Sequence, residues 1–381
     1  MCEVETLIIG GGIAGLSLAA QIARHGETIV LEAESAPGYH ASGRSVAIAH
    51  FGLGERVVRT LTALSLPDLA APPGDERAPY AVKHPALHIA RSEQAHELDA
   101  LEEVHRAFGC DFARISGEEA LTLLPVLRAG PEFCHEAIVD HGALKLDTDA
   151  MLQGHLKDLR MAGGNLLTGA RVTAIERESG RWAVQSAAGP FRAKRLVNAA
   201  GAWADEIADL AGVRKIGIEP RRRTVISFGG PGGVDVSLWP FTKTVGAGFY
   251  ILPEGNGRLL ASPMDEHAST PCDAAPEELD IATIADRVQQ ATTLPIRRIA
   301  HSWAGLRSFA PDELPVIGYP QDTPNFFWFA GQGGYGFQTS PALARIGEAL
   351  MLDSEWPRDM AAADVHPKLF APERCQVRIS E

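Results

Sequence analysis

The chain has 381 residues, of which 45% are hydrophobic and 22% charged, a composition typical of a globular protein with room for two domains. Its 35 basic and 48 acidic side chains give a formal net charge of −13, which opposes binding to nucleic acid and to anionic lipid. No apolar run approaches the ~20 residues of a transmembrane helix.

The chain opens with a predicted strand, a glycine-rich turn and a helix. Residues 6–9 are apolar and rich in β-branched side chains, and apolar residues then recur at helical spacing from Ile13 to His25-Gly26. Between the two lies Gly10-x-Gly12-x-x-Gly15. In this spacing the first glycine permits a tight turn, the second lets backbone amides approach a pyrophosphate, and the third lets the helix pack closely against the strand.

A second apolar run supports a nucleotide site. Residues 28–31 predict a strand, and Glu32 follows at the distance from the glycines where a ribose hydroxyl is usually bound and a 2′-phosphate repelled. A glycine-rich turn without a ligand is the alternative, but it does not account for the order of strand, turn, helix, strand and acid. The pattern predicts a dinucleotide and does not distinguish FAD from NAD.

The rest of the chain alternates between helical and strand patterns. Further helices are expected at residues 55–71, 92–108, 147–161, 203–211, 277–291 and 338–351. Pro72 to Asp75 end the first of these, and a capping box from Ser116 to Glu119 opens one more helix. Strands are expected at residues 85–91, 132–139, 171–176, 182–185, 195–199, 222–228, 249–252, 258–261, 299–309 and 325–330.

Cysteine and histidine spacing argues against a disulfide framework and against a metal site. The cysteines form no CxxC pair, which indicates reduced thiols, and Pro85 separates His84 from His88. We therefore expect no metal. Because the first strand begins within a few residues of Met1, we also expect no signal peptide and a cytoplasmic location. The cysteines are Cys2, Cys110, Cys134, Cys272 and Cys375.

Five short motifs together make the chain resemble a known enzyme family. They are Gly10-x-Gly12-x-x-Gly15, Gly38-Tyr39-His40-x-x-Gly43-Arg44-Ser45, Val197-Asn198-Ala199-Ala200-Gly201-Ala202-Trp203, Trp303-Ala304-Gly305-Leu306-Arg307 and Gly331-Gln332-Gly333-Gly334-Tyr335-Gly336. Over almost its whole length the chain resembles the FAD-dependent D-amino acid oxidase superfamily, and within it the bacterial D-arginine dehydrogenases and related D-amino acid dehydrogenases. Non-covalent FAD is expected, because no cysteine lies between Cys272 and Cys375, where relatives of monomeric sarcosine oxidase attach the cofactor.

The resemblance implies an α/β fold with two domains. A discontinuous, Rossmann-like FAD-binding domain would comprise residues 1–80, 145–220 and 297–370, which includes the return of residues 299–309 to the nucleotide-binding part. A substrate domain of residues 81–144 and 221–296 would place an antiparallel sheet over the flavin, and residues 371–381 would form a tail.

The resemblance also implies the residues of the active site. Arg307 matches the arginine that binds the substrate carboxylate in a bidentate pair, and Tyr250 matches a tyrosine that binds the same group. Arg222 matches an active-site arginine, although the run Arg221 to Arg223 is also typical of a solvated face. His50 and Tyr319 are candidates for tuning the loss of the amine proton.

The remaining implied contacts are with the substrate side chain and the cofactor. The pocket would include Ile48, Leu53, Leu87, Gly334 and Tyr335. Cofactor contacts are expected from Gly10, Gly12, Ile13, Ala14, Gly15, Glu32, Ala33, Ala41, Ser42, Gly43, Arg44, Ser45, Ala47, Ile48, Val172, Ala200, Gly201, Trp203, Arg307, Gly333, Gly334, Tyr335, Gly336, Phe337 and Gln338. The helix that begins in the last segment would stabilise negative charge on the flavin.

Three differences from the arginine-oxidising enzymes bear on the substrate. Leu87, Ile48 and Leu53 stand where those enzymes have a glutamate, a histidine and a tyrosine. A cationic side chain would lose water there without gaining a counter-charge. We therefore expect neutral or hydrophobic substrates and poor oxidation of D-arginine and D-lysine, with the D configuration resting on the resemblance alone.

The expected reaction is oxidative deamination, in which hydride passes from Cα to flavin N5 and the imino acid hydrolyses to a 2-oxo acid and ammonia. Oxygen, a quinone or another carrier would accept the electrons, and a quinone would place the protein at the periphery of the inner membrane. Oxidation of a 2-hydroxy acid or of a secondary amine such as an N-methyl amino acid is an alternative. A flavin-binding electron-transfer subunit without its own substrate and an NAD-dependent dehydrogenase are two others.

Overall fold

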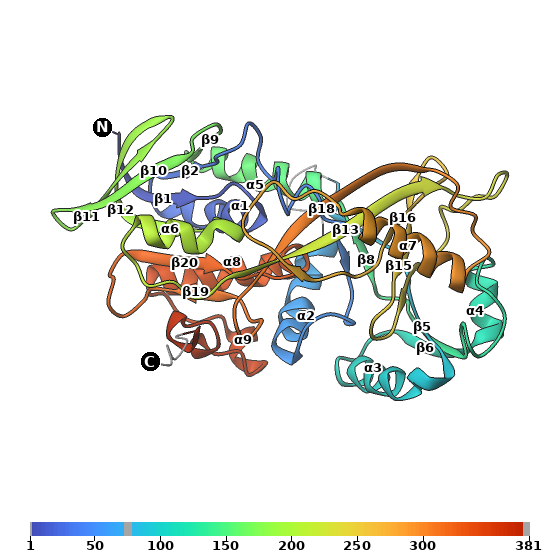
Figure 1. Cartoon of the computed structure of the whole chain (residues 1–381). Coiled ribbons are helices and arrows are strands. Elements are labelled where there is room, and N and C mark those ends of the chain that lie inside the picture. The colour runs from blue at the N-terminus through green and yellow to red at the C-terminus, as the bar shows by residue number, and fades with distance from the viewer. Residues whose placement is uncertain (1, 72–77, 376–381) are drawn as a thin grey trace, which may run out of the picture.

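The computed structural model describes residues 2–71 and 78–375, which form three β-sheets with helices packed against them. The break expected at Pro72 to Asp75 lies outside these residues. Figure 1 shows two halves: β1 and its neighbours lie with both termini, whereas β5, β6 and β15 lie in the other half. The α/β class predicted from the sequence is confirmed.

The first sheet has eight strands and carries the glycine turn. β1 is parallel to β12 and to β2, and the three strands end together because Ile9 is in register with both Asn198 and Leu31. The turn therefore leaves the sheet at the carboxyl ends of its parallel strands, where open α/β sheets bind ligands. The strands are β1 (Cys2–Ile9), β2 (Thr28–Leu31), β9 (Asn165–Leu167), β10 (Val172–Glu178), β11 (Arg181–Ser186), β12 (Gly189–Asn198), β19 (Val316–Gly318) and β20 (Phe326–Ala330).

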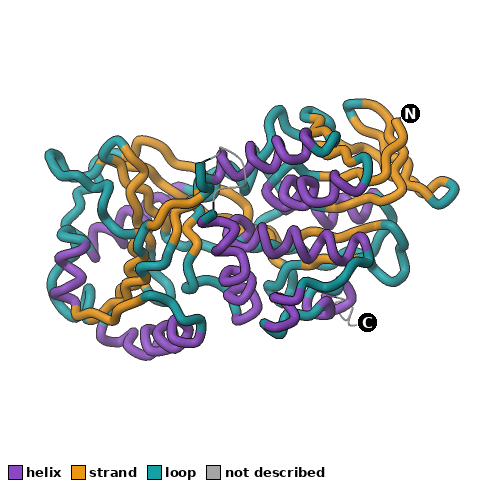
Figure 2. Tube along the Cα trace, turned by 180° about the vertical axis from the view of Figure 1, so that it is seen from behind, coloured by secondary structure: helices purple, strands orange, loops and turns teal. Residues whose placement is uncertain are grey.

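Helices cover both faces of this sheet. On one face α1, α5 and α8 bury Leu16, Leu156 and Ile346 in a common core, and Figure 2 shows the helices of this half gathered together. On the other face α6 packs over Leu7 through Ile207. The helices of this half are α1 (Ile13–Ile22), α2 (Arg56–Ala70), α5 (Thr148–Met161), α6 (Ala204–Leu210), α8 (Gly336–Leu352) and α9 (Arg358–Ala362). Within the described ranges, no helix is long and apolar enough to cross a bilayer.

The second sheet, here called the roof sheet, has nine strands that are antiparallel except where β14 lies parallel to β5. Its strands are β5 (Ala86–Ala90), β6 (Phe112–Ser116), β7 (Glu136–Asp140), β13 (Glu219–Gly229), β14 (Phe241–Thr244), β15 (Tyr250–Gly255), β16 (Arg258–Ser262), β17 (His267–Ala268) and β18 (Ile299–Phe309). Its helices are α3 (Ala95–Ala107), α4 (Gly117–Leu123) and α7 (Glu278–Ala291). The predicted capping box is present, since Ser116 Oγ accepts the backbone N–H of Glu119 at 3.3 Å.

A small third sheet of β3 (Ile48–Ala49), β4 (Ala81–Lys83) and β8 (Leu144–Leu146) completes the described strands. One strand corrects an expectation: residues 299–309 do not join the nucleotide-binding sheet, because β18 is hydrogen-bonded to β13 in the roof sheet. An apolar strand pattern does not indicate which strand it pairs with, because the pairing strand lies far away in the sequence. The strand expected at 132–139 begins at Glu136. The strands that were not predicted are β3, β4, β6, β8, β9, β14, β17 and β19.

Candidate functional site

A continuous cleft runs past the glycine turn and ends beneath the roof sheet. Its outer arm is lined by the ends of β1 and β2 and by residues 199–203. Its inner chamber lies between the start of α8, residues 44–53 and the roof sheet. The arm and the chamber share lining residues, among them Gly12, Ser42 and Arg44, so one elongated ligand can occupy both.

The backbone is packed so closely at the glycine turn that side chains are excluded. Gly10 has a φ of +113°, and a Cβ there would lie 2.7 Å from the carbonyl carbon of Ala199 and closer still to its oxygen. A Cβ on Gly15 would overlap the carbonyl oxygen of Gly10. These contacts bring the end of β12 and the start of α1 together, as the predicted roles of the two glycines require.

Glu32 lies in the outer arm at the end of β2 and is held by backbone donors. Its Oε2 accepts the N–H of Gly11 at 2.8 Å, and its Oε1 accepts the N–H of Glu34 at 2.9 Å. The first turn of α1 carries no acidic side chain, so the positive end of its dipole is available to an anion. Ser42 Oγ accepts the N–H of Ile13 at 2.9 Å beside this end. These residues fit a dinucleotide with its pyrophosphate at α1 and its ribose at Glu32.

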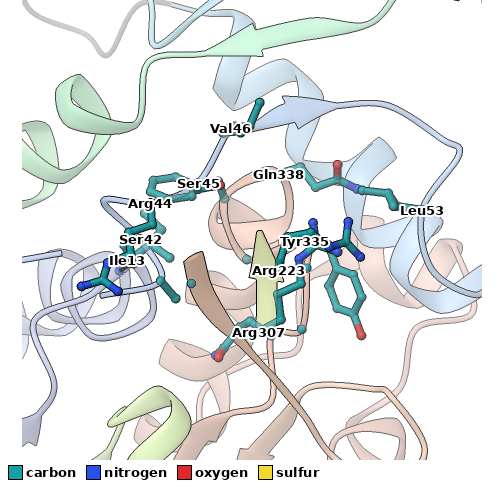
Figure 3. A pocket seen from close by; sticks show the side chains of 18 of the residues that line it. Ile13, Ser42, Arg44, Ser45, Val46, Leu53, Arg223, Arg307, Tyr335 and Gln338 are labelled. Atoms are coloured by element: carbon teal, nitrogen blue, oxygen red, sulfur yellow. Dashed lines mark hydrogen bonds between the residues drawn. The ribbon is translucent and has the colours of Figure 1, made fainter. Parts of the chain in front are cut away.

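The predicted cofactor residues lie along this cleft. All of them line the arm or the chamber except Gly15 and Gly43, which lie in the packed turns behind it. Figure 3 shows Ile13 and Ser42 on one side of the chamber and Arg223 and Tyr335 on the other. Among the described residues, no group of three histidines, cysteines, aspartates or glutamates is placed to hold a metal ion.

The roof sheet presents a different arginine from the one expected. Successive residues of a strand face opposite sides of the sheet. Arg222 faces away from the chamber, where it pairs with Glu277 and, at 3.2 Å, with Asp280 of α7. The assignment of Arg222 to the site is therefore wrong, and its neighbour Arg223 lines the chamber instead. The run of three arginines was a usable sequence pattern, but it did not indicate which of them faces inward.

Arg223 is buried and held in place. Its Nε donates to the carbonyl of Asp265 at 2.7 Å, and its Nη2 donates to Glu266 Oε1 at 2.7 Å. Burial, reinforced by the nearby Arg307, lowers the pKa of Arg223 to about 10. The guanidinium groups of Arg223 and Arg307 thus both face the inner chamber.

Arg307 and Tyr250 line the chamber, as the resemblance implies. Arg307 comes from β18, and its Nη1 lies 3.4 Å from Glu266 Oε1. Tyr250 comes from β15 and is 6% exposed, and burial raises the pKa of its hydroxyl. The phenol therefore keeps its proton at neutral pH and can donate a hydrogen bond to an anion.

Lys243 is a charged lining residue that the sequence did not indicate. It lies on β14, in register with Tyr250 of β15 on one side and with His88 of β5 on the other. Its Nζ donates to the carbonyl of Gly52 at 3.2 Å. Burial, together with Arg223 and Arg307, lowers the pKa of Lys243 to about 8. Because β14 was not predicted, no pattern indicated which face this lysine occupies.

His50 lines the chamber and Tyr319 does not. His50 is 3% exposed, and burial, followed by the charge of Lys243, lowers its pKa well below the usual value. The ring is neutral, and its Nδ1 accepts the N–H of Gly52 at 3.0 Å, which leaves the proton on Nε2. Tyr319 instead packs its ring on Phe327 and directs its hydroxyl to the carbonyl of Met351 at 3.4 Å, so its assignment to the site is wrong.

Of the residues expected around the substrate side chain, all line the chamber except Leu87. Ile48 and Leu53 line the chamber, as do Gly334 and Tyr335. Leu87 is fully buried in the core on the far face of the roof sheet, because strand alternation turns it away from the chamber. Leu87 is therefore not among the residues that line the chamber.

Comparison with known proteins identifies a family that the chain matches and several similar proteins. The family model described as FAD dependent oxidoreductase (DAO) matches residues 5–350. The hydrogen cyanide synthase subunit HcnC of Pseudomonas aeruginosa is 25% identical, with 94% of each chain covered. Among solved structures, L-proline dehydrogenase from P.horikoshii has a TM-score of 0.82 at 20% identity, with 98% of each chain covered. Glycine oxidase from Geobacillus kaustophilus has a TM-score of 0.80 at 20% identity, with 96% of this chain and 99% of that chain covered.

Proposed function

The chain belongs to the family of FAD-dependent oxidoreductases, and from this premise we propose that it deaminates an amino acid of D configuration by oxidation at Cα. FAD is the cofactor, and amino acids or amines are the substrate class. The D configuration and the narrower likeness to D-arginine dehydrogenases are parts of the proposal.

The proposal rests on one observation. Arg307, Arg223 and Tyr250 converge from β18, β13 and β15 on the inner chamber, which is continuous with the outer arm of the cleft. Two guanidinium groups and a protonated phenol form a binding site for a carboxylate. A ligand that places its carboxylate there has the rest of its length within the chamber, beside the start of α8.

The protein's own residues bind and orient the substrate. FAD, when bound, supplies the acceptor for the hydride that leaves Cα. Arg307 and Tyr250 hold the carboxylate, and Ile48 and Phe241 contribute apolar surface that excludes water. With its proton on Nε2, His50 is a hydrogen-bond donor and not a base. Hydride leaves Cα once the substrate ammonium has lost its proton, and His50 is not the group that accepts this proton.

The visible spectrum of the purified protein tests the proposal. We expect two flavin bands, which are bleached anaerobically by one or more D-amino acids and not by their L-enantiomers. Bleaching by 2-hydroxy acids alone would contradict it. Readmitting oxygen, or adding a quinone, to the reduced protein then identifies the electron acceptor.

Oxidation of a secondary amine is the second candidate. L-proline dehydrogenase, whose name specifies a secondary amine, shares the fold at a TM-score of 0.82. The carboxylate site formed by Arg307, Arg223 and Tyr250 would serve such a substrate equally well. Proline and N-methyl amino acids therefore belong in the same substrate panel, and bleaching by them alone would favour this candidate.

The preference for a neutral or hydrophobic side chain loses its support. It rested partly on Leu87, which lies outside the chamber, whereas Arg223 and Lys243 lie inside it. Exclusion of D-arginine and D-lysine is now expected for a stronger reason, because a cationic side chain would meet like charges.

A further inference from the structure

The charges in the inner chamber do not balance. Four cationic side chains line it, Arg44, Arg223, Lys243 and Arg307, and no aspartate or glutamate is among the described lining residues. Arg44 is paired with Asp273, which leaves the other three to be compensated. The nearby carboxylate is Glu266, which lies 2.7 Å from Arg223 and 3.4 Å from Arg307. Glu266 is also 3.7 Å from Arg221, which pairs in addition with Glu219 and Glu313.

Among these cations, Lys243 has the least negative charge nearby to neutralise it. Its hydrogen bond goes to the neutral carbonyl of Gly52. The strongest electrostatic influences on it are Arg223 and Arg307, both repulsive, and only then Glu266. Asp265, the adjacent carboxylate, lies 3.7 Å from Arg223 and accepts hydrogen bonds from the backbone N–H of Thr224 at 2.8 Å and from the Thr224 hydroxyl at 2.9 Å, so it compensates Arg223 and not Lys243.

An ammonium group withdrawn from water without a counter-charge is costly, and an anionic ligand removes that cost. The α-carboxylate of a substrate neutralises part of the excess at Arg307 and Arg223. A second acidic group on the substrate would neutralise the remainder at Lys243.

We propose that the substrate carries a second carboxylate, as aspartate and glutamate do, and that Lys243 is the residue that selects it. This inference rests on the proposed function. Lys243 and Tyr250 are in register on neighbouring strands, which lie about 4.8 Å apart. Both side chains therefore rise next to each other from the chamber face of the sheet, and Ile48 and Leu53 offer apolar surface to the methylene groups that join two carboxylates.

Matched substrates test the assignment. D-Aspartate against D-asparagine, and D-glutamate against D-glutamine, differ in charge and hardly in shape. In the wild-type holoenzyme we expect the acid to bleach the flavin anaerobically about 10- to 100-fold more efficiently than the amide, as expected for a charge-assisted contact. A ratio at or below one would overturn the proposal.

Two variants of Lys243 and one control extend the test. Lys243→Met is expected to bring the ratio of acid to amide close to one, and Lys243→Arg to retain most of it. Lys145→Met is the matched control, because Lys145 also donates to a backbone carbonyl, that of Pro253 at 2.9 Å, but lies outside the cleft. Retention of the ratio in Lys243→Met would overturn the proposal, as would loss of it in Lys145→Met alone. An effect of Lys243→Met confined to reoxidation by oxygen would also overturn it.

Binding of non-reactive acids separates this inference from the proposed reaction. Glutarate and butyrate can be titrated against the flavin spectrum without turnover. Tighter binding of glutarate that disappears in Lys243→Met supports the second anion site, even if no amino acid bleaches the flavin and the proposed reaction fails. If amino acids bleach the flavin but glutarate binds no better than butyrate, the reaction stands and the inference fails.

Discussion

Replacing Gly10 by alanine tests the structural basis of the cofactor site. The backbone φ of +113° is unfavourable for alanine by about 1–3 kcal/mol. The new methyl group would also press on the carbonyl of Ala199, and forcing extra volume into a packed region costs about 1–3 kcal/mol more. The sum, about 2–6 kcal/mol, is a large part of the 5–15 kcal/mol that stabilises a typical domain. Since Gly10 and Ala199 both line the outer arm of the cleft, the strain falls on the cofactor site, and we expect loss of FAD before complete unfolding.

Gly180→Ala is the control for Gly10→Ala. Gly180 also has a positive φ, +80°, but a Cβ there would meet no atom within 4 Å. The assay is the ratio of flavin to protein absorbance after gel filtration, together with the melting temperature. We expect Gly10→Ala to lose most of its flavin and to melt at least about 4 °C lower, whereas Gly180→Ala keeps its flavin. Equal flavin content in the two variants would refute the argument from the close contact with Ala199.

Four further predictions concern the chamber. Arg307→Met is expected to raise the dissociation constant of a non-reactive carboxylate about 10- to 100-fold by spectral titration, while Arg222→Met, which alters an arginine outside the cleft, leaves it unchanged. Tyr319→Phe is expected to leave anaerobic flavin reduction unchanged, since its hydroxyl contacts the carbonyl of Met351 and not the chamber; a change of more than about twofold would contradict this. Because the pKa of Lys243 is lowered to about 8, affinity for glutarate should be full below that pH and fall as the pH rises through it, whereas Lys243→Arg keeps its affinity; titrations from about pH 6.5 to 9.5 measure both. His50→Gln should leave the shape of the kcat/KM profile unchanged at neutral and higher pH, since burial already keeps the ring neutral.

The parts of the site that could be predicted from the sequence are contiguous in it. The glycine turn, Glu32 and the start of α8 each lie within a few residues of the element that places them. Local spacing therefore determined their positions relative to one another. The same holds for the capping box at Ser116, in which a hydroxyl meets an amide three residues along the chain.

Two of the misassigned residues, Arg222 and Leu87, lie on strands of the roof sheet, where a shift of one residue changes the face that a side chain occupies. Arg222 and Arg223 are adjacent in sequence, yet one pairs with α7 and the other lines the chamber. Leu87 is turned away by the same alternation. Its face depends on register with β7 and β14, which are distant in sequence, so apolar periodicity could not indicate it. Tyr319 was misassigned for a different reason, since it directly follows β19, its ring packs on Phe327 of β20, and no local pattern places it.

The cofactor site and the substrate site are built by different sheets, which explains how one fold can hold the same cofactor and accept different substrates. The dinucleotide arm is formed by the first sheet and its turns, whereas Arg223, Lys243, Tyr250 and Arg307 all project from the roof sheet. Inward-facing residues of β14 can change charge without moving β1 or α1, since a strand substitution that preserves register leaves its neighbours in place. Lys243 is such a position, because its hydrogen bond is to a backbone carbonyl and not to another side chain. If Lys243 selects an acidic substrate, as proposed, exchanging it for a neutral residue should shift the preference from acidic toward uncharged amino acids while the flavin stays bound.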